Sequence, residues 1–366
     1  MLPTPPPLRV PVRTLLGLSL LLAACAEPKP VVVSWTLEPT GDTVIAPYGD
    51  VTDGAWLDGT RWVVIAPQDR AVSVVDFARK SLSPFIKAQP KELEQPFHLF
   101  RAGDSVFIGD WLKRRLTSWS LAGAMGGALP AADALRGALP RGRDAEGRWY
   151  FELRPAPGPD GSGNRDSAAI LRAANGSGKL DTVARLAPFD LVEVSSDGRR
   201  RLERRLLSGQ DRWGVLPDGS LWIARVTQNR VDWRDSSGTV HEGDDLPDPV
   251  LPLTDNDREI FLSKFDAGLR PTVSQIPFAA IKPPFENALT APDGLVWLVK
   301  NRAIGDSVRN YQVVNHAGQL VQSVTHRGLG HIIALGGGFA IVGEPFAGGM
   351  RLLLFRVSAP AAPRGV

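Results

Sequence analysis

The sequence predicts an all-β protein, a six-bladed β-propeller, and three observations support this fold class. One short motif recurs six times, with an apolar lead-in, a Gly-containing turn and an aromatic residue, as in LPDGSLW at residues 216–222. The 366 residues include 37 Gly and 31 Pro, which favours many short strands joined by turns. The motif also recurs mainly at spacings in the low forties, which is typical of one four-stranded blade.

Each copy of the motif predicts two antiparallel strands that meet at a hairpin. The aromatic residues of the six copies are Trp62, Phe107, Trp149, Trp222, Trp297 and Phe339. When the residue three positions before each aromatic is used as a marker, the intervals are 45, 42, 73, 75 and 42 residues. Strand-like runs follow the copies at 72–76, 116–123, 170–176, 231–238, 311–318 and 351–357. The two long intervals therefore require insertions.

Both long intervals contain sequence that is typical of an additional element. The first holds a loop at 155–166, rich in Gly, Pro and Asp, and an additional hairpin over about 187–207 that turns at Asp197 and Gly198. The second predicts a helix over about 255–267, because Thr254 and Asp257 resemble a capping box. Gly268 is expected to end that helix.

Closure of the ring requires the two ends of the propeller, residues 31–358, to share one blade. The run VVVSWTLE at 31–38 has the pattern of a strand and precedes the first copy of the motif. We expect it to pair in the last blade beside RLLLFRV at 351–357, so that no long strand edge stays exposed. The Pro- and Ala-rich tail at 359–366 is expected to be loose.

The first 24 residues have the pattern of a signal peptide. Arg9 and Arg13 precede an apolar run at 15–24, which is shorter than the roughly 20 residues needed to span a bilayer. The run ends in Leu-Ala-Ala-Cys25, which holds the single cysteine of the chain and resembles the lipobox of bacterial lipoproteins. The alternative is an ordinary secretory leader with an incidental cysteine.

The lipobox resemblance implies cleavage before Cys25, lipidation of Cys25 and anchorage in a membrane through the tether 25–30. Several acyl chains hold a protein firmly, since each buried CH₂ contributes about 0.8 kcal/mol. Ala26 stands where an Asp would favour the inner membrane, so the resemblance favours the outer membrane. We expect an exported protein of the cell envelope.

The stretch DRWGVLPDGSLWIARVTQNRVDWRDSSGTV at 211–240, with LTDNDREIFLSKF at 253–265, resembles six-bladed propeller proteins of the TolB-like and NHL-like kind. Such proteins include exported lipoproteins of environmental bacteria. The resemblance covers most of 31–358 and implies a fold. Because that group has no established activity, it implies no catalytic residue.

Propellers usually bind ligands in a funnel at one end of the axis, lined by loops that lead into the innermost strands. Polar residues five to eight positions before the markers are the candidates: Asp53, His98, Arg141, Arg143, Asp211, Arg212, Glu286, Asn287 and His331. Arg141 and Arg212 would offer planar donors to a polar or anionic ligand. Alternatively, these side chains pair with one another and close the channel.

The sequence contains no signature of a common catalytic site. Neither the G-x-S-x-G elbow nor the phosphate-binding G-x-x-x-x-G-K-[ST] pattern occurs, and the five His residues are scattered. We therefore expect no catalytic residue, no metal and no cofactor. The alternative is a metal-dependent hydrolase or lactonase, with an axial divalent cation held by Glu286 or Asp53.

The charge pattern argues against a nucleic-acid partner. The net charge is +3, and Arg9 and Arg13 would leave with the signal peptide. The sharpest charged feature is RRRLERR at 199–205, either a docking surface or, as we expect, a solvated strand face. The sequence thus favours a monomeric, membrane-anchored binding or scaffold protein for an unknown protein, glycan or small molecule.

Overall fold

The computed structural model describes residues 30–86, 92–154, 167–173, 179–196 and 199–357. The chain divides into two units, Met1–Pro30 and Val31–Val366, and all strands and helices below belong to the second. The predicted signal peptide, Cys25, the tail 359–366 and the loop 155–166 lie outside the described residues. In the part that is described, no helix has the length and apolar character needed to cross a membrane.

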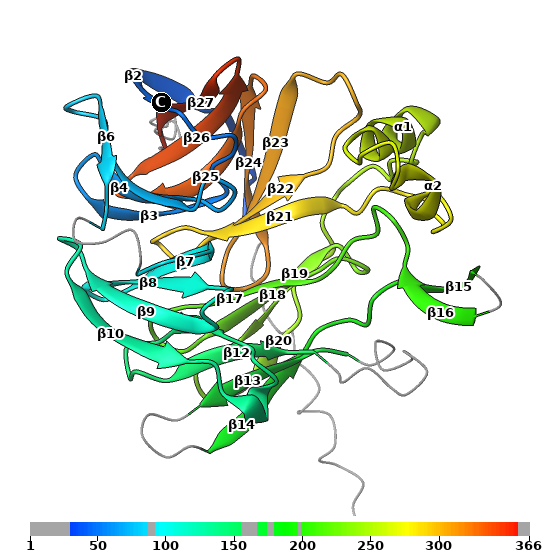
Figure 1. Ribbon diagram of the computed structural model, residues 1–366, viewed down its shortest axis with the longest axis horizontal. Coiled ribbons are helices and arrows are strands. Elements are labelled where there is room, and N and C mark those ends of the chain that lie inside the picture. Colours follow the sequence, from blue (N-terminus) through cyan, green and yellow to red (C-terminus); the bar gives the residue numbers. More distant parts are fainter. Residues whose placement is uncertain (1–29, 87–91, 155–166, 174–178, 197–198, 358–366) are drawn as a thin grey trace, which may run out of the picture. The chain divides into compact units, whose positions relative to one another are not determined.

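The second unit is a six-bladed β-propeller, and its sheets surround a common centre (Figure 1). The first three blades are each four-stranded and antiparallel. Blade 1 comprises β3 (Asp53–Asp58), β4 (Arg61–Ala66), β5 (Ala71–Asp76) and β6 (Ser81–Pro84). Blade 2 comprises β7 (Pro96–Ala102), β8 (Ser105–Asp110), β9 (Arg115–Ser120) and β10 (Met125–Pro130), followed by the short helix η1 (Asp133–Leu135). Blade 3 comprises β11 (Pro140–Arg143), β12 (Trp149–Leu153), β13 (Ala169–Ala173) and β14 (Leu180–Arg185).

The last three blades complete the ring. Blade 4 comprises β17 (Arg212–Val215), β18 (Leu221–Arg225), β19 (Arg230–Arg234) and β20 (Val240–His241). Blade 5 comprises β21 (Phe285–Thr290), β22 (Val296–Lys300), β23 (Val308–Val314) and β24 (Leu320–Arg327), with β1 (Val33–Thr36) added at its edge. Blade 6 comprises β25 (His331–Gly336), β26 (Phe339–Phe346), β27 (Gly349–Arg356) and β2 (Glu38–Ala46).

The recurring motif is the hairpin between the first two strands of each blade. In blade 4, the Gly219 N–H donates to the Leu216 carbonyl at 2.9 Å, and the positive φ of Gly219, +85°, suits glycine. Trp222, at the end of this motif, is 2% exposed and packs against the neighbouring apolar side chains of blades 4 and 5. The first strands contact one another in a closed circle, β3–β7–β11–β17–β21–β25, which makes them the innermost strands.

The N-terminal part of the propeller completes the last blade, as expected, but it does so with a different strand from the one predicted. The last blade is completed by β2, which pairs antiparallel with β27 from Glu38↔Arg356 to Ala46↔Met350. The prediction that 31–38 forms this strand was wrong, because β1 pairs parallel with β24 of blade 5 instead. Leu37, which separates β1 from β2 in the sequence, is buried. The strand pattern of β2 is obscured in sequence by the register shift between Pro39 and Thr43.

The two insertions form the predicted kinds of element. The hairpin consists of β15 (Leu191–Ser196) and β16 (Arg199–Arg204), and its turn residues Asp197 and Gly198 lie outside the described residues. The helical insertion contains α1 (Asp255–Ser263) and α2 (Arg270–Val273). The hairpin and helices lie at the right of Figure 1. The segments that follow β16 and α2 are joined, because the Leu206 N–H donates to the Pro277 carbonyl at 3.0 Å.

The capping box of α1 is confirmed, whereas its predicted end is not. The Asp257 N–H donates to Thr254 Oγ1 at 3.2 Å, and the Thr254 N–H donates to Asp257 Oδ2 at 2.9 Å. The helix ends at Ser263 rather than near Gly268. The Arg270 guanidinium donates to the Phe265 carbonyl at 2.9 Å, so a side chain satisfies backbone acceptors beyond the helix before Gly268 is reached.

Candidate functional site

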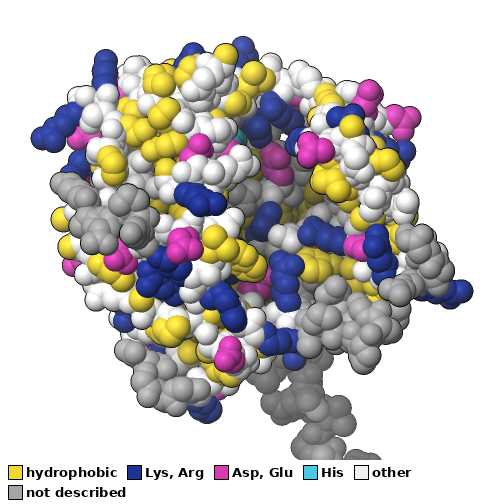
Figure 2. Space-filling view, viewed as in Figure 1, with side chains coloured by type: hydrophobic (Ala, Val, Ile, Leu, Met, Phe, Trp, Pro, Cys, Tyr) yellow, Lys and Arg dark blue, Asp and Glu magenta, His cyan; other side chains and the backbone are white. Residues whose placement is uncertain are grey.

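Seven of the predicted residues stand where the innermost strands begin. Asp53, Arg212 and His331 are the first residues of β3, β17 and β25. Within the first three residues of their strands lie Arg141, Glu286, Asn287 and His98. Because the innermost strands form one circle, their starting ends meet at one face of the propeller. On the face seen in Figure 2, Lys and Arg side chains gather at the edges of a hollow.

Asp53 and His98 connect neighbouring blades. Asp53 accepts hydrogen bonds from the N–H groups of Gly54 at 2.8 Å and of Leu99, in blade 2, at 3.2 Å. Burial nevertheless raises the pKa of Asp53 to about 6. His98 Nε2 lies 3.1 Å from the Pro140 carbonyl of blade 3, and burial with the nearby Arg141 charge lowers its pKa to about 4. These two side chains therefore hold blades 1, 2 and 3 together at the face.

Arg141 belongs to a cluster with a shared carboxylate. Its guanidinium lies 2.5 Å from Glu152 Oε2, which also accepts a hydrogen bond from the Trp213 indole at 2.9 Å. Arg154 lies 3.3 Å from the other oxygen of Glu152. Burial raises the pKa of Glu152, but Arg141, Trp213 and Arg154 together outweigh burial and hold it below its usual range. The Glu152 carboxylate is thus fully engaged by blades 3 and 4.

Glu286 and His331 form the blade 5 and blade 6 part of the face. Glu286 Oε1 accepts a hydrogen bond from Arg309 at 2.8 Å, while the Glu286 backbone carbonyl accepts one from Arg212 at 3.2 Å. Burial and the Arg309 charge lower the pKa of His331. Asn287, which follows Glu286, is exposed.

The structure separates two further predicted residues, Asp211 and Arg143, from the rest by their contacts. The Asp211 side chain is fully buried and accepts hydrogen bonds from Ala187 N–H at 2.8 Å, Val226 N–H at 3.0 Å and Arg225 at 2.9 Å. It therefore fixes the connection into blade 4. Arg143 stacks over Trp149, 4.8 Å from the ring centroid.

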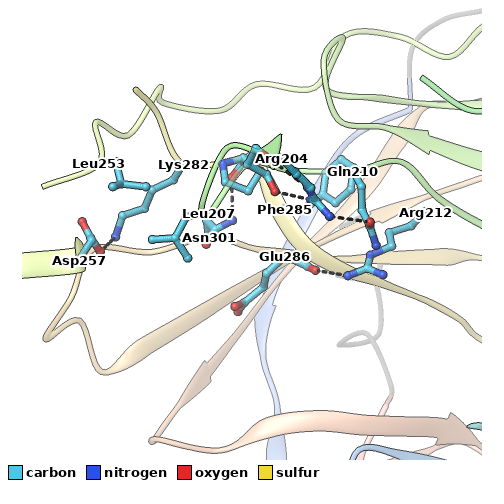
Figure 3. Close-up of a pocket in the computed structure, with 13 residues that line it drawn as sticks. Arg204, Leu207, Gln210, Arg212, Leu253, Asp257, Lys282, Phe285, Glu286 and Asn301 are labelled. Atoms are coloured by element: carbon cyan, nitrogen blue, oxygen red, sulfur yellow. Dashed lines mark hydrogen bonds and ion pairs between the residues drawn. The ribbon is translucent and has the colours of Figure 1, made fainter. Parts of the chain in front are cut away.

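A cavity of about 340 Å³ lies between the two insertions and the starting ends of β17 and β21. Figure 3 shows Arg204, Gln210 and Arg212 at one end and the Asp257–Lys282 pair at the other. Its lining combines residues of the hairpin, the helical insertion and blades 4 and 5: Arg204, Leu207, Ser208, Gly209, Gln210, Arg212, Leu253, Asp257, Lys282, Pro283, Phe285, Glu286 and Asn301.

Only Arg212 and Glu286 of the predicted candidates line this cavity. In the sequence, Arg204 stands out only as part of the charged run 199–205. Three other charged residues of that run pair with acids, Arg200 with Glu193 at 3.3 Å, Arg201 with Glu203 at 2.9 Å and Arg205 with Asp190 at 3.3 Å. The solvated-face interpretation thus describes these three residues, whereas Arg204 turns toward the cavity. Nothing in the sequence distinguishes Arg204 from its neighbours.

Potential metal ligands do not gather in the described part of the chain. Among residues 30–86, 92–154, 167–173, 179–196 and 199–357, no group of three or more His, Cys, Asp or Glu side chains could hold an ion. The acids near the face are engaged by Arg residues or backbone N–H groups.

No protein-family model and no curated protein matches the sequence. Among solved structures, a DUF4221 family member from Bacteroides vulgatus is 8% identical, with 87% of this chain and 97% of that chain covered and a TM-score of 0.48. The calcium-binding protein regucalcin from Agrobacterium tumefaciens is 9% identical, covers 89% and 97%, and has a TM-score of 0.43. A gluconolactonase from Xanthomonas campestris is 12% identical, covers 90% and 99%, and has a TM-score of 0.44. These similarities concern the fold alone, and the chain is a six-bladed β-propeller.

Proposed function

We propose that this chain is a non-catalytic binding protein of the cell envelope, whose ligand occupies the cavity beside blades 4 and 5. The observation that supports this function is that both insertions contribute to one cavity, the hairpin through Arg204 and the helical insertion through Asp257. Blades 1, 2 and 6 form without comparable insertions, so the insertions are not required for a blade to form. The cavity volume of about 340 Å³ lies within the range of small-molecule sites, roughly 300–1,000 Å³.

The contacts of Glu286 and Asp53 favour binding over metal-dependent hydrolysis. A divalent cation would require their carboxylate oxygens as ligands. Glu286 is already paired with Arg309 at 2.8 Å, and both Asp53 oxygens accept backbone N–H groups. A cation at either position would have to displace these donors.

We further propose that Cys25 carries the lipid that anchors the protein in the outer membrane, and that the propeller acts as a monomer without nucleic-acid partners. The support is the Leu-Ala-Ala-Cys25 pattern, in which the only cysteine of the chain stands at the position that lipidation requires.

Replacement of Cys25 tests the anchor. In the native host, the wild-type protein should fractionate with membranes and be released by detergent, whereas Cys25→Ser should be recovered without detergent. Retention of the Cys25→Ser protein in the membrane fraction would contradict lipid anchoring.

The binding function is tested by comparing retained ligands and turnover. Mass spectrometry of small molecules released from purified protein should find a ligand in the wild type and not in Leu207→Trp, which fills the cavity. Leu329→Trp is the matched control, because Leu329 is 67% exposed and does not line the cavity. Esterase or lactonase turnover that requires added Ca²⁺ or Zn²⁺, and is lost in Glu286→Gln, would instead support the hydrolase.

A further inference from the structure

We infer that the cavity recognises a small organic anion, in which a phosphate or carboxylate group on an apolar body is held by Arg204 and Arg212. This inference rests on the proposed function and adds the chemical class of the ligand. It follows from the charges at the two ends of the cavity, from the free donors of Arg212 and from the apolar side chains between the ends.

The two ends of the cavity differ in how their positive charges are compensated. At one end, Lys282 Nζ lies 2.5 Å from Asp257 Oδ1 and donates to the Arg302 carbonyl at 2.9 Å. Both partners of this ion pair are more than nine-tenths buried. Lys282 is therefore neutralised by the protein itself.

At the other end, the arginines contact only neutral groups of the described chain. Arg204 donates to Ser208 Oγ at 3.0 Å, to the Ser208 carbonyl and to Gln210 Oε1 at 3.0 Å. Arg212 donates to the Glu286 carbonyl at 3.2 Å. Within the described residues, neither arginine forms an ion pair with a carboxylate.

The neighbouring carboxylates are paired with other arginines. Glu152 pairs with Arg141 and Arg154, Asp190 with Arg205, and Glu286 with Arg309. Burial lowers the pKa of Arg212, and the charges of Arg141 and Arg204 lower it further. Half-buried cations of like charge are unfavourable without a counter-charge, so a bound anion would stabilise this end of the cavity.

Arg212 has the donors that such an anion needs. A guanidinium carries five N–H donors in a planar fork, and Arg212 uses one of them within the described chain. Paired, parallel N–H groups match the oxygens of a carboxylate or phosphate. Arg204, which is held in place by Ser208 and Gln210, adds a second positive charge beside it (Figure 3).

The remaining walls suit an apolar body rather than a second charge. Leu207, Leu253 and Phe285 line the cavity together with Arg204 and Arg212. The volume of about 340 Å³ is near the lower limit for ligand sites, which favours a small molecule over a polymer segment.

Calorimetric titration of the full propeller with phenyl phosphate tests this inference. We expect the wild type to bind phenyl phosphate at least about 10-fold more tightly than inorganic phosphate, which lacks the apolar body, or benzyl alcohol, which lacks the charge. Arg212→Gln should weaken phenyl phosphate binding about 10-fold or more, and Arg212→Lys should weaken it less, because it keeps the charge but loses the fork.

Arg200→Gln is the matched control, since Arg200 belongs to the same strand as Arg204 but is 79% exposed and pairs with Glu193. It should leave phenyl phosphate binding unchanged. Equal binding of phenyl phosphate by wild type and a folded Arg212→Gln, or no binding by wild type, would overturn the anion assignment. Benzyl alcohol that binds the wild type but not Leu207→Trp would then leave the cavity as a site for neutral ligands, so the proposed function would survive this failure.

Discussion

Equivalent positions of the propeller have different tasks in its two halves. In blades 1 and 2, the side chains reach the backbone of the next blade: Asp53 contacts Leu99 of blade 2, and His98 contacts Pro140 of blade 3. In blade 4, Arg212 stands at the same end of the innermost strand and also donates to the backbone of the next blade, at Glu286, but it borders a cavity as well. The repeat thus determines where a side chain emerges, and the segment packed above it determines whether that side chain holds the fold or is available to a ligand.

The contrast is sharpest between two adjacent residues. Asp211 is enclosed, with its carboxylate bonded to Ala187, Val226 and Arg225, whereas Arg212 keeps most of its donors for the cavity. Asp211 should therefore matter for stability and Arg212 for binding. Asp211→Ala, with the largest expected effect on stability, and Arg212→Gln, with the smallest, test this division, and His98→Gln tests a residue that connects neighbouring blades.

Asp211→Ala should lower the free energy of unfolding by about 3 kcal/mol. Removal of Asp211 takes from Arg225 one of its two carboxylate partners, the other being Asp232, and two backbone N–H groups lose their acceptor in a buried site. Chemical denaturation measured by tryptophan fluorescence gives this difference. Asp218→Ala is the control in the same blade, because Asp218 is an exposed turn residue that bonds Ser220, and it should cost under about 1 kcal/mol. An equal loss in the two variants would remove the distinction between enclosed and exposed acids.

The hairpins, the ring and both insertions could be predicted from sequence because each depends on a local pattern. Gly219 with Trp222 marks a turn and a buried strand, and Thr254 with Asp257 marks a helix start. The strand that closes the ring was missed because its irregular register near Pro39 hides the alternation. The end of α1 was missed because a side chain of Arg270, seven residues beyond Ser263, satisfies the backbone there.

The cavity could be predicted only in part, since its residues come from segments far apart in sequence. The position of Arg212 at the start of an innermost strand follows from the repeat. Arg204 turns inward, while Arg200 and Arg205 pair with acids, and this difference depends on the packing of the hairpin against residues 277 and 278. Neither composition nor spacing records that contact.

His98→Gln should flatten the loss of stability in acid. The folded-state pKa of His98 is lowered to about 4 from 6.5, so its contribution is complete above pH 6.5 and is lost as pH falls toward 4. With allowance for its partial exposure, the wild type should lose about 2 kcal/mol more than the variant between pH 7 and 4. Denaturant midpoints measured at several pH values give the difference.

Asp53→Asn serves as the opposite control for the same face. Its raised pKa of about 6 means that its contribution is complete below 3.8 and is lost as pH rises through 6. The variant should therefore gain stability relative to wild type as pH rises. If both variants followed the wild-type curve, the titration of the face would not depend on these two residues.

Arg212→Gln should change stability least, by under about 0.5 kcal/mol, although it weakens anion binding most. Arg212 contributes one hydrogen bond to the Glu286 carbonyl, which glutamine can replace, and its removal relieves repulsion from Arg141 and Arg204. Thermal unfolding without ligand should be nearly the same in variant and wild type, whereas phenyl phosphate should raise the midpoint of the wild type alone. A loss of several kcal/mol in the ligand-free variant would place Arg212 with Asp211, as part of what holds blade 4 in the ring.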